Sequence, residues 1–264
     1  MPDKYQNAFE QDSMAQMCTS LDEWLATPLG QHLLARESAY FDSVVANVFG
    51  FNAVQIGHPE FDLLRNCRIP QRYRVGYDGT VALRADVELL PFASQSMDLV
   101  VIPHTLEFAA HPHQVLREVE RILMPEGHLI ISGFNPRSLW GASRWLKQRE
   151  GGFPWCGRFI TLPRLKDWLS LLGFETQGGR MCCYTPPFSQ TKWLQRFAFM
   201  EAAGDRWWAM GGGVYFIEAV KRVQGMRLIM PNWREPAVKS AALTPAARNV
   251  VNLNQYRKLK HPNE

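Results

Sequence analysis

Short apolar runs alternate with amphipathic stretches along this chain, and their order predicts an α/β fold built on a parallel sheet. The clearest stretch is residues 82–140, where a helical pattern lies between two apolar runs. A strand, a helix and a strand in this order form a parallel βαβ unit. His111-Pro112 opens the helix and Pro125-Glu126-Gly127 breaks it. The predicted strands are Ala53–Ile56, Tyr73–Val75, Val81–Arg84, Leu99–Pro103 and Leu129–Ser132, and the inward helix residues are Val115, Leu116, Val119, Ile122 and Leu123.

The patterns after this unit predict how the sheet closes. Thr161-Leu162-Pro163 is predicted to begin a further helix, which Gly173 ends because glycine readily adopts the left-handed conformation of a helix terminus. Residues 175–184 and 214–222 are predicted to form a closing antiparallel pair. The chain contains no internal repeats.

The residues before the sheet, from about Ser20 to Phe49, carry a helical pattern with two apolar faces. Thr27 is the predicted cap and Pro28 lies in the predicted first turn. Gly50 is the predicted stop of the second helix. These helices form a predicted N-terminal cap, which either covers the ligand-binding end of the sheet or simply packs against it.

Asp86 is the most informative single residue, because it follows an apolar strand and precedes a polar turn. Ligands of open parallel sheets bind at the carboxyl ends of the strands. A carboxylate there can accept a hydrogen bond from an exocyclic amine or a hydroxyl group.

Several short motifs, in this order and spacing, resemble the class I S-adenosylmethionine-dependent methyltransferases of the methyltransferase-11 type, and the layout is most similar to the bacterial YafS-like group. The resemblance covers residues 20–222. The motifs are Asp86 with Leu90-Pro91-Phe92, the run from Ser96 to Val101, Leu116-Arg117-Glu118, Pro125-Glu126-Gly127, Gly133-Phe134-Asn135-Pro136 and the run from Asp167 to Leu172.

This resemblance implies a Rossmann-like sheet, mostly parallel with an antiparallel last strand and helices on both faces. It also implies S-adenosylmethionine as the cofactor. Asp86 would then meet the adenine amine, and Val87 would meet the ring through its backbone. Gly57 would be the first glycine of the cofactor loop, and His104 would line the mouth between cofactor and acceptor.

The cofactor loop departs from the family pattern. The matching stretch reads Gln55-Ile56-Gly57-His58-Pro59-Glu60-Phe61, with glutamine in place of the acid and with Pro59 and Phe61 in place of two glycines. The chain between Gly57 and Asp86 is also short for two strand–helix crossovers, each of which needs about ten to twelve residues. Asp78 is the nearest acid that could grip the ribose, and it also fits an ordinary turn.

His104 follows the predicted fourth strand directly and has two interpretations. It could take a proton from an acceptor hydroxyl or amine, or it could be a hydrogen-bonded turn residue. The spacing of His104, His111 and His113 matches no standard metal site, so no metal is predicted.

The composition indicates where in the cell the protein is expected and how its charge is distributed. No apolar run approaches about eighteen residues, so no membrane span is predicted. The five cysteines show no paired spacing, and no signal peptide pattern is present, which favours a reducing cytoplasm. Residues 231–264 contain six Lys and Arg residues and two Glu residues, which together account for the net charge of +4.

Three regions are predicted: a helical cap (1–50), a methyltransferase-like domain (51–222) and a basic, disordered tail (223–264).

Six of the nine tryptophans lie in residues 135–159 and 186–213, on the predicted acceptor side. They either pack a subdomain or form a lid over an apolar acceptor or a surface that touches a membrane. The Asn-Pro and Pro-Pro dipeptides after the later strands do not occupy the position used by amino-methylating nucleic-acid enzymes, so nucleic acid is not a predicted partner.

Two functions are open on these observations. The first is methyl transfer from S-adenosylmethionine to a small-molecule or lipid-like acceptor, with no obligatory catalytic residue. The second is a non-catalytic relative of the same fold that acts as a binding or scaffold module. The acceptor and the oligomeric state are not specified by the sequence.

Overall fold

The structure is a computed structural model, and it describes residues 24–58, 61–76, 83–147, 152–188, 191–208 and 210–223. Residues 1–23, Pro59, Asp78, the first two residues of the strand predicted at Val81–Arg84, and the tail from residue 224 onward lie outside the described residues.

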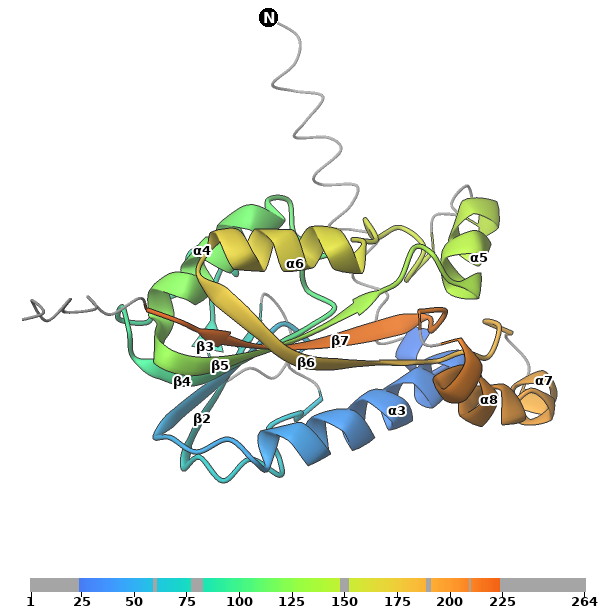
Figure 1. The fold of residues 1–264 in the computed structure, drawn as a ribbon, viewed down its shortest axis with the longest axis horizontal. Helices are drawn as coiled ribbons and strands as arrows, with labels where there is room; N and C mark the ends of the chain where they lie inside the picture. The colour runs from blue at the N-terminus through green and yellow to red at the C-terminus, as the bar shows by residue number, and fades with distance from the viewer. Residues whose placement is uncertain are drawn as a thin grey trace, which may run out of the picture. The chain divides into compact units, whose positions relative to one another are not determined.

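Seven strands form one sheet in the order β3-β2-β1-β4-β5-β7-β6 (Figure 1). β1 to β5 pair in parallel, whereas β7 is antiparallel to both β5 and β6. This topology confirms the predicted mostly parallel sheet with an antiparallel last strand. The strands are β1 (Asn52–Ile56), β2 (Gln71–Gly76), β3 (Leu83–Arg84), β4 (Met97–Pro103), β5 (Leu123–Phe134), β6 (Phe174–Cys182) and β7 (Val214–Lys221).

The predicted βαβ unit is β4, α4 (Pro112–Ile122) and β5. The Pro-Glu-Gly turn lies inside β5 rather than before it. Met97 of β4 pairs with Leu123 and Leu99 pairs with His128, so the residues between them bulge out of the ladder. Glu126, in this bulge, has a positive φ of 64°.

Helices cover both faces of the sheet, as predicted. α3 (Pro28–Val45) lies on one face, and α4 and α6 (Leu162–Leu171) lie on the other (Figure 1). The apolar stripe of α4 packs on strand residues such as Val100 and Ile131, and α3 packs through Leu33 and Phe41 on the opposite face. The shorter helices α5 (Leu139–Lys147), α7 (Thr191–Arg196) and α8 (Phe199–Trp207) lie toward one end of the sheet.

The N-terminal cap differs in part from the prediction. Thr27 caps α3 by accepting a hydrogen bond from the Gly30 N–H, and Pro28 lies in the first turn, as predicted. The segment Pro28–Val45 is one continuous helix, which ends before Gly50, and Trp24 and Leu25 are helical but separated from it by a turn at residues 26–27. The predicted apolar residues from Leu29 to Val45 belong to α3, whereas Trp24 and Leu25 precede it and Val48 follows it.

The connections around the first three strands are short. The described residues between β1 and β2, and those between β3 and β4, form turns and contain no helix. No helix begins in the described part of the loop after β1, although a helix N-terminus at this position is what would favour polar groups of a ligand.

Candidate functional site

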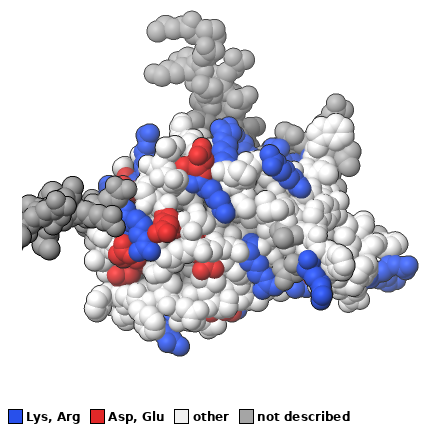
Figure 2. Space-filling model, in the orientation of Figure 1, with Lys and Arg blue, Asp and Glu red and all other residues white. Residues whose placement is uncertain are grey.

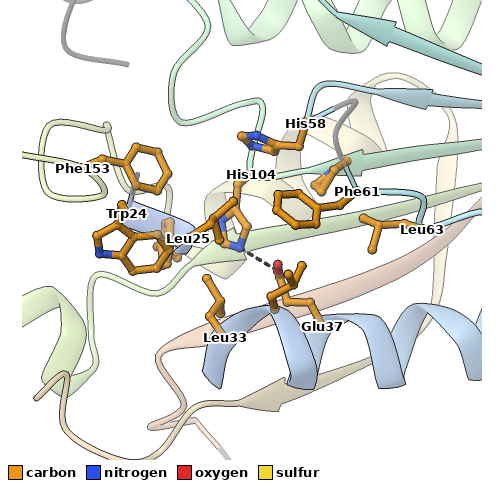
Figure 3. Close-up of a pocket in the computed structure, with 12 residues that line it drawn as sticks. Trp24, Leu25, Leu33, Glu37, His58, Phe61, Leu63, His104 and Phe153 are labelled. Atoms are coloured by element: carbon orange, nitrogen blue, oxygen red, sulfur yellow. Dashed lines mark hydrogen bonds and ion pairs between the residues drawn. The ribbon is translucent and has the colours of Figure 1, made fainter. Parts of the chain in front are cut away.

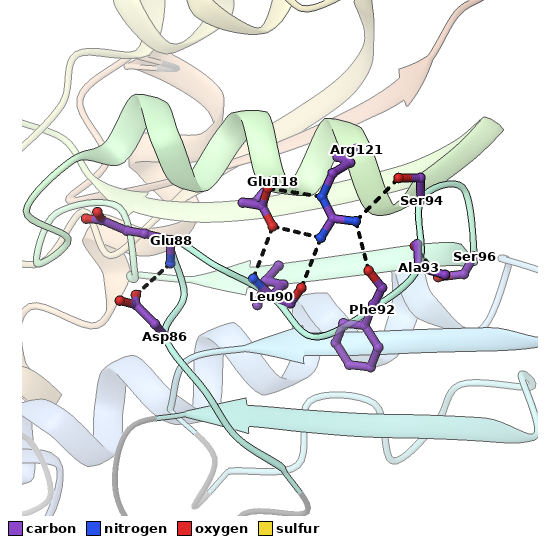
Figure 4. A network of polar contacts seen from close by, with 9 residues as sticks. All are labelled: Asp86, Glu88, Leu90, Phe92, Ala93, Ser94, Ser96, Glu118 and Arg121. Atoms are coloured by element: carbon purple, nitrogen blue, oxygen red, sulfur yellow. Dashed lines mark hydrogen bonds and ion pairs between the residues drawn. The ribbon is translucent and has the colours of Figure 1, made fainter.

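Asp86 lies just after β3, at the carboxyl end of the strand, and its side chain is exposed. Its Oδ1 accepts a hydrogen bond of 2.8 Å from the N–H of Glu88, which forms a local turn (Figure 4). Val87 beside it is buried. The two residues to which the family resemblance assigns adenine therefore follow the carboxyl end of β3.

The loop that carries Asp86 is held by Arg121 of α4 (Figure 4). Its guanidinium donates hydrogen bonds to the carbonyls of Leu90 and Phe92, at 2.9 and 2.8 Å. It also pairs with the buried carboxylate of Glu118, which accepts the N–H of Leu90. The hydrogen bond from Arg121 lowers the pKa of Glu118. The helix thus fixes the backbone that follows Asp86.

Gly57 ends β1 with a positive φ of 85°. The Thr105 hydroxyl occupies the space beside its Cα, where any Cβ would collide with it. That hydroxyl lies 2.8 and 2.9 Å from the backbone carbonyl oxygens of Ile56 and Pro103 and can donate its one proton to either, so it bridges the ends of β1 and β4. The close approach that glycine permits here is used by Thr105.

Gln55, which replaces the family's acid, is fully buried. Its Nε2 donates to the carbonyls of His58 and Phe61 at 2.9 and 2.7 Å, and its Oε1 accepts the N–H of Leu63 at 3.0 Å. The Gln55 side chain therefore holds described residues at both ends of the loop after β1. Glutamine can donate and accept at once, which a carboxylate cannot do.

His104 is buried between two carboxylates and has a positive φ of 42°. Its Nε2 lies 2.7 Å from Glu37 of α3, and its Nδ1 lies 3.2 Å from Glu107. Burial alone lowers the pKa of His104, but the two carboxylates outweigh it and raise the pKa to about 10. In this arrangement His104 is an imidazolium at neutral pH, and both of its ring N–H groups donate hydrogen bonds to the neighbouring carboxylates.

A cavity beside His104 is nearly filled (Figure 3). Its volume is about 20 Å³, which is room for roughly one water molecule. Phe61 from the loop after β1, Trp24 before α3 and Phe153 line it. A site for a ligand of cofactor size needs about 300 Å³ or more. In this arrangement the space at the end of β1 is too small for S-adenosylmethionine.

The predicted site residues fall into two places. His104 lines the filled cavity together with His58, which follows Gly57 directly. Enclosure and the neighbouring His104 lower the pKa of His58 to about 4. Asp86 and Val87 do not line that cavity. The roles assigned to all four residues stay predictions.

A larger groove of about 630 Å³ opens between the beginnings of α4 and α6. Glu88 and Leu106, from the loops that carry Asp86 and His104, form part of its lining. Three arginines, Arg117, Arg158 and Arg164, also line it, and all three are exposed. The apolar part of the lining includes Phe159, Ile160 and Trp168. The groove can therefore accommodate a ligand with an apolar body and a negative group.

The other histidines that the sequence analysis considered lie apart from His104. His111 pairs with Glu88, and His113 packs on the ring of Trp168, so neither joins His104. Within the described ranges, no group of three or more His, Cys, Asp or Glu residues is placed to hold a metal ion. The described helices include none that is long and apolar enough to cross a membrane.

Sequence reasoning missed the two carboxylates that hold His104. Glu37 had a signal, because it interrupts an apolar ridge of α3 at intervals of four, formed by Leu29, Leu33, Phe41 and Val45. A charged residue on a buried ridge is rare unless it is paired. Glu107, three residues after His104, had no comparable signal.

Known proteins resemble the chain in both sequence and fold. The methyltransferase-domain family model matches residues 60–131, which include Asp86, Val87 and His104. The uncharacterised protein Rv2003c of Mycobacterium tuberculosis is 31% identical over 209 residues, which are 75% of this chain and 70% of that protein. The uncharacterised protein YafS of Escherichia coli is 34% identical over 156 residues, 58% of this chain, and the match spans 65% of that protein.

A solved structure supports the same fold. A methyltransferase from Thermotoga maritima, described as S-adenosylmethionine-dependent and as a possible histamine N-methyltransferase, superposes with a TM-score of 0.57 at 18% identity. The superposition covers 80% of this chain and 99% of that one. The matched methyltransferase domain implies S-adenosylmethionine as the cofactor.

Proposed function

The chain belongs to the class I S-adenosylmethionine-dependent methyltransferase family, of the methyltransferase-11 type, and from this premise we propose that it transfers a methyl group to a small-molecule or lipid-like acceptor. The observation that carries the proposal is the fixed carboxylate of Asp86 at the end of β3, within the matched domain. Methyl transfer from a sulfonium ion is a direct displacement, for which positioning of the reactants can supply most of the catalysis.

The cavity beside His104 must widen before a cofactor can bind there. Phe61 and Trp24 must move away from His104 before a ligand of cofactor size can enter beside Gly57. Phe61 belongs to the short loop after β1, and Trp24 precedes the cap of α3. Neither residue lies inside a strand of the sheet, so both can shift without breaking a ladder of backbone hydrogen bonds.

The groove between α4 and α6 supplies a place for the acceptor. It adjoins the loops of Asp86 and His104, and its three arginines favour an acceptor with a carboxylate or phosphate group. Calorimetry with phenyl phosphate and with phenol as probes tests this part. We expect the phosphate to bind more tightly and the Arg158→Met variant to lose that preference. Equal binding of the two probes would contradict an anionic acceptor.

A second function is supported by the same filled cavity. A protein that has lost the cofactor would keep the fold and act as a binding or scaffold module. Phe61 in the place of a glycine and the closed loop around Gln55 favour this alternative.

Calorimetric titration with S-adenosylmethionine and S-adenosylhomocysteine separates the two functions. We expect micromolar binding by the wild-type protein, weakened about tenfold or more in Asp86→Ala, because a hydrogen bond to a charged group is worth about 1.5–3 kcal/mol. Phe61→Ala is expected to bind more tightly than the wild type, since the cavity is then partly open. No binding to any of the three folded proteins at millimolar ligand would reject the enzyme and favour the binding module.

A further inference from the structure

The segment from α7 to Met210 exposes an unusual amount of apolar surface. We call Trp193, Phe199, Trp207, Trp208 and Met210 the aromatic patch. Their side chains are 44%, 65%, 83%, 51% and 59% exposed, respectively. Outside the patch, Trp140 and Trp155 are buried, whereas Trp145 of α5 is 80% exposed. Apolar side chains gathered in this way usually mark an interaction site.

The patch stands on an anchored segment. Leu194 of α7 is buried, and the buried carboxylate of Glu201 in α8 accepts hydrogen bonds from the backbone N–H and the hydroxyl of Thr185. Gly204 of α8 packs so closely on the ring of Tyr184 that a Cβ would collide with it. The segment is therefore fixed to the domain through Leu194, Glu201 and Gly204, while the side chains of the aromatic patch stay exposed.

The exposed charged side chains that the structure describes in α7 and α8 are basic. Lys192, Arg196 and Arg206 are exposed, and the guanidinium of Arg196 lies 5.8 Å from the centre of the Trp193 ring. The carboxylate of Glu201 is buried. Figure 2 shows blue side chains and no red ones at this edge of the described surface, where α7 and α8 lie in Figure 1. The surface is therefore both aromatic and cationic.

We propose that the aromatic patch docks on a lipid surface that carries negative headgroups. Tryptophan favours the boundary between headgroups and acyl chains, where its ring is partly buried and its N–H stays hydrated. Basic side chains beside it are attracted to anionic lipids. The contact is peripheral, since the described helices include none that could span a bilayer. A symmetric contact with a second copy would instead place Lys192, Arg196 and Arg206 against their own counterparts.

Sedimentation of the full-length protein with vesicles tests the proposal. The vesicles contain either phosphatidylglycerol mixed with phosphatidylcholine or phosphatidylcholine alone. We expect the wild-type protein to partition at least about tenfold more strongly onto the anionic vesicles, and 0.5 M salt to weaken that binding because it screens charge. Tryptophan emission should shift to shorter wavelength on binding, as the exposed rings leave water.

Two variants assign the binding to the patch. In Phe199→Gln/Trp207→Gln we expect partitioning to fall about tenfold or more, because two large apolar side chains no longer enter the bilayer. Leu171→Gln is the matched control, since Leu171 of α6 is 82% exposed outside the patch, and its binding should equal that of the wild type. Both proteins keep the basic tail, so a loss in the first variant alone cannot come from residues 224–264.

Three results would overturn the proposal. The first is equal binding of the patch variant and the wild type. The second is no binding to either vesicle. The third is self-association of the wild type, in analytical ultracentrifugation, that the patch variant loses; this would assign the patch to a second copy. None of these readouts requires the cofactor, so the proposal can fail or succeed independently of methyl transfer.

Discussion

Replacing His104 by alanine is expected to lower the free energy of unfolding by about 3–5 kcal/mol, the usual cost of removing one partner of a buried ion pair. Glu37 and Glu107 would then remain buried without the imidazolium that lies 2.7 and 3.2 Å from them. One oxygen of Glu107 already has no hydrogen-bond partner among the described residues. Urea unfolding at pH 6.5 measures the change.

The same substitution should alter the pH dependence of stability. The pKa of His104 is raised from 6.5 to about 10 in the folded state. Its contribution is therefore complete below about pH 6.5 and is lost as the pH rises through 10. His58 acts in the opposite direction, because its pKa is lowered to about 4, and its contribution is lost as the pH falls from 6.5. We expect the wild type to be most stable near pH 6.5.

Urea unfolding across pH 6 to 10 distinguishes the variant from the wild type. The wild type should lose stability toward pH 10 by an amount that His104→Ala does not show. His111→Ala is the matched control, since His111 is exposed and pairs with Glu88 at the surface. Replacing His111 should lower the free energy of unfolding by less than about 1 kcal/mol. Parallel pH curves for the wild type and His104→Ala would show that His104 is not charged in the folded protein.

Replacing Arg121 by methionine is expected to cost about 2–3 kcal/mol. The substitution keeps much of the side chain's length but removes the donors to the carbonyls of Leu90 and Phe92. It also leaves the carboxylate of Glu118 without its cation. Because these contacts fix the loop after Asp86, the same variant should bind S-adenosylhomocysteine more weakly.

Arg117→Met provides the control for this variant. Arg117 lies one turn earlier on α4 and is exposed, so its loss should change the free energy of unfolding by less than about 0.5 kcal/mol. Urea unfolding of both variants at pH 7 makes the comparison. Equal stabilities for Arg121→Met and Arg117→Met would mean that the loop after Asp86 is held by other contacts.

Much of the fold was predictable because its signals are local. The buried runs around Val54, Val100 and Ile130 are central strands, and the apolar positions of α4 repeat with helical spacing. Thr27, Pro28 and Gly173 mark helix ends through their own backbone and side-chain chemistry. The boundary of α3 was less predictable, since the apolar pattern continues past Val45 into a turn.

By itself, the sequence determined the order of strands and helices and the position of Asp86 at the end of a strand, since neighbouring residues decide both. Tertiary structure alone decided the surroundings of His104, because Glu37 is 67 residues away in the sequence and belongs to α3, a helix packed on the sheet. It also decided that Phe61 fills the cavity and that Trp140 is buried while Trp207 is exposed. Burial depends on which distant elements pack together, and residue type alone does not carry that information.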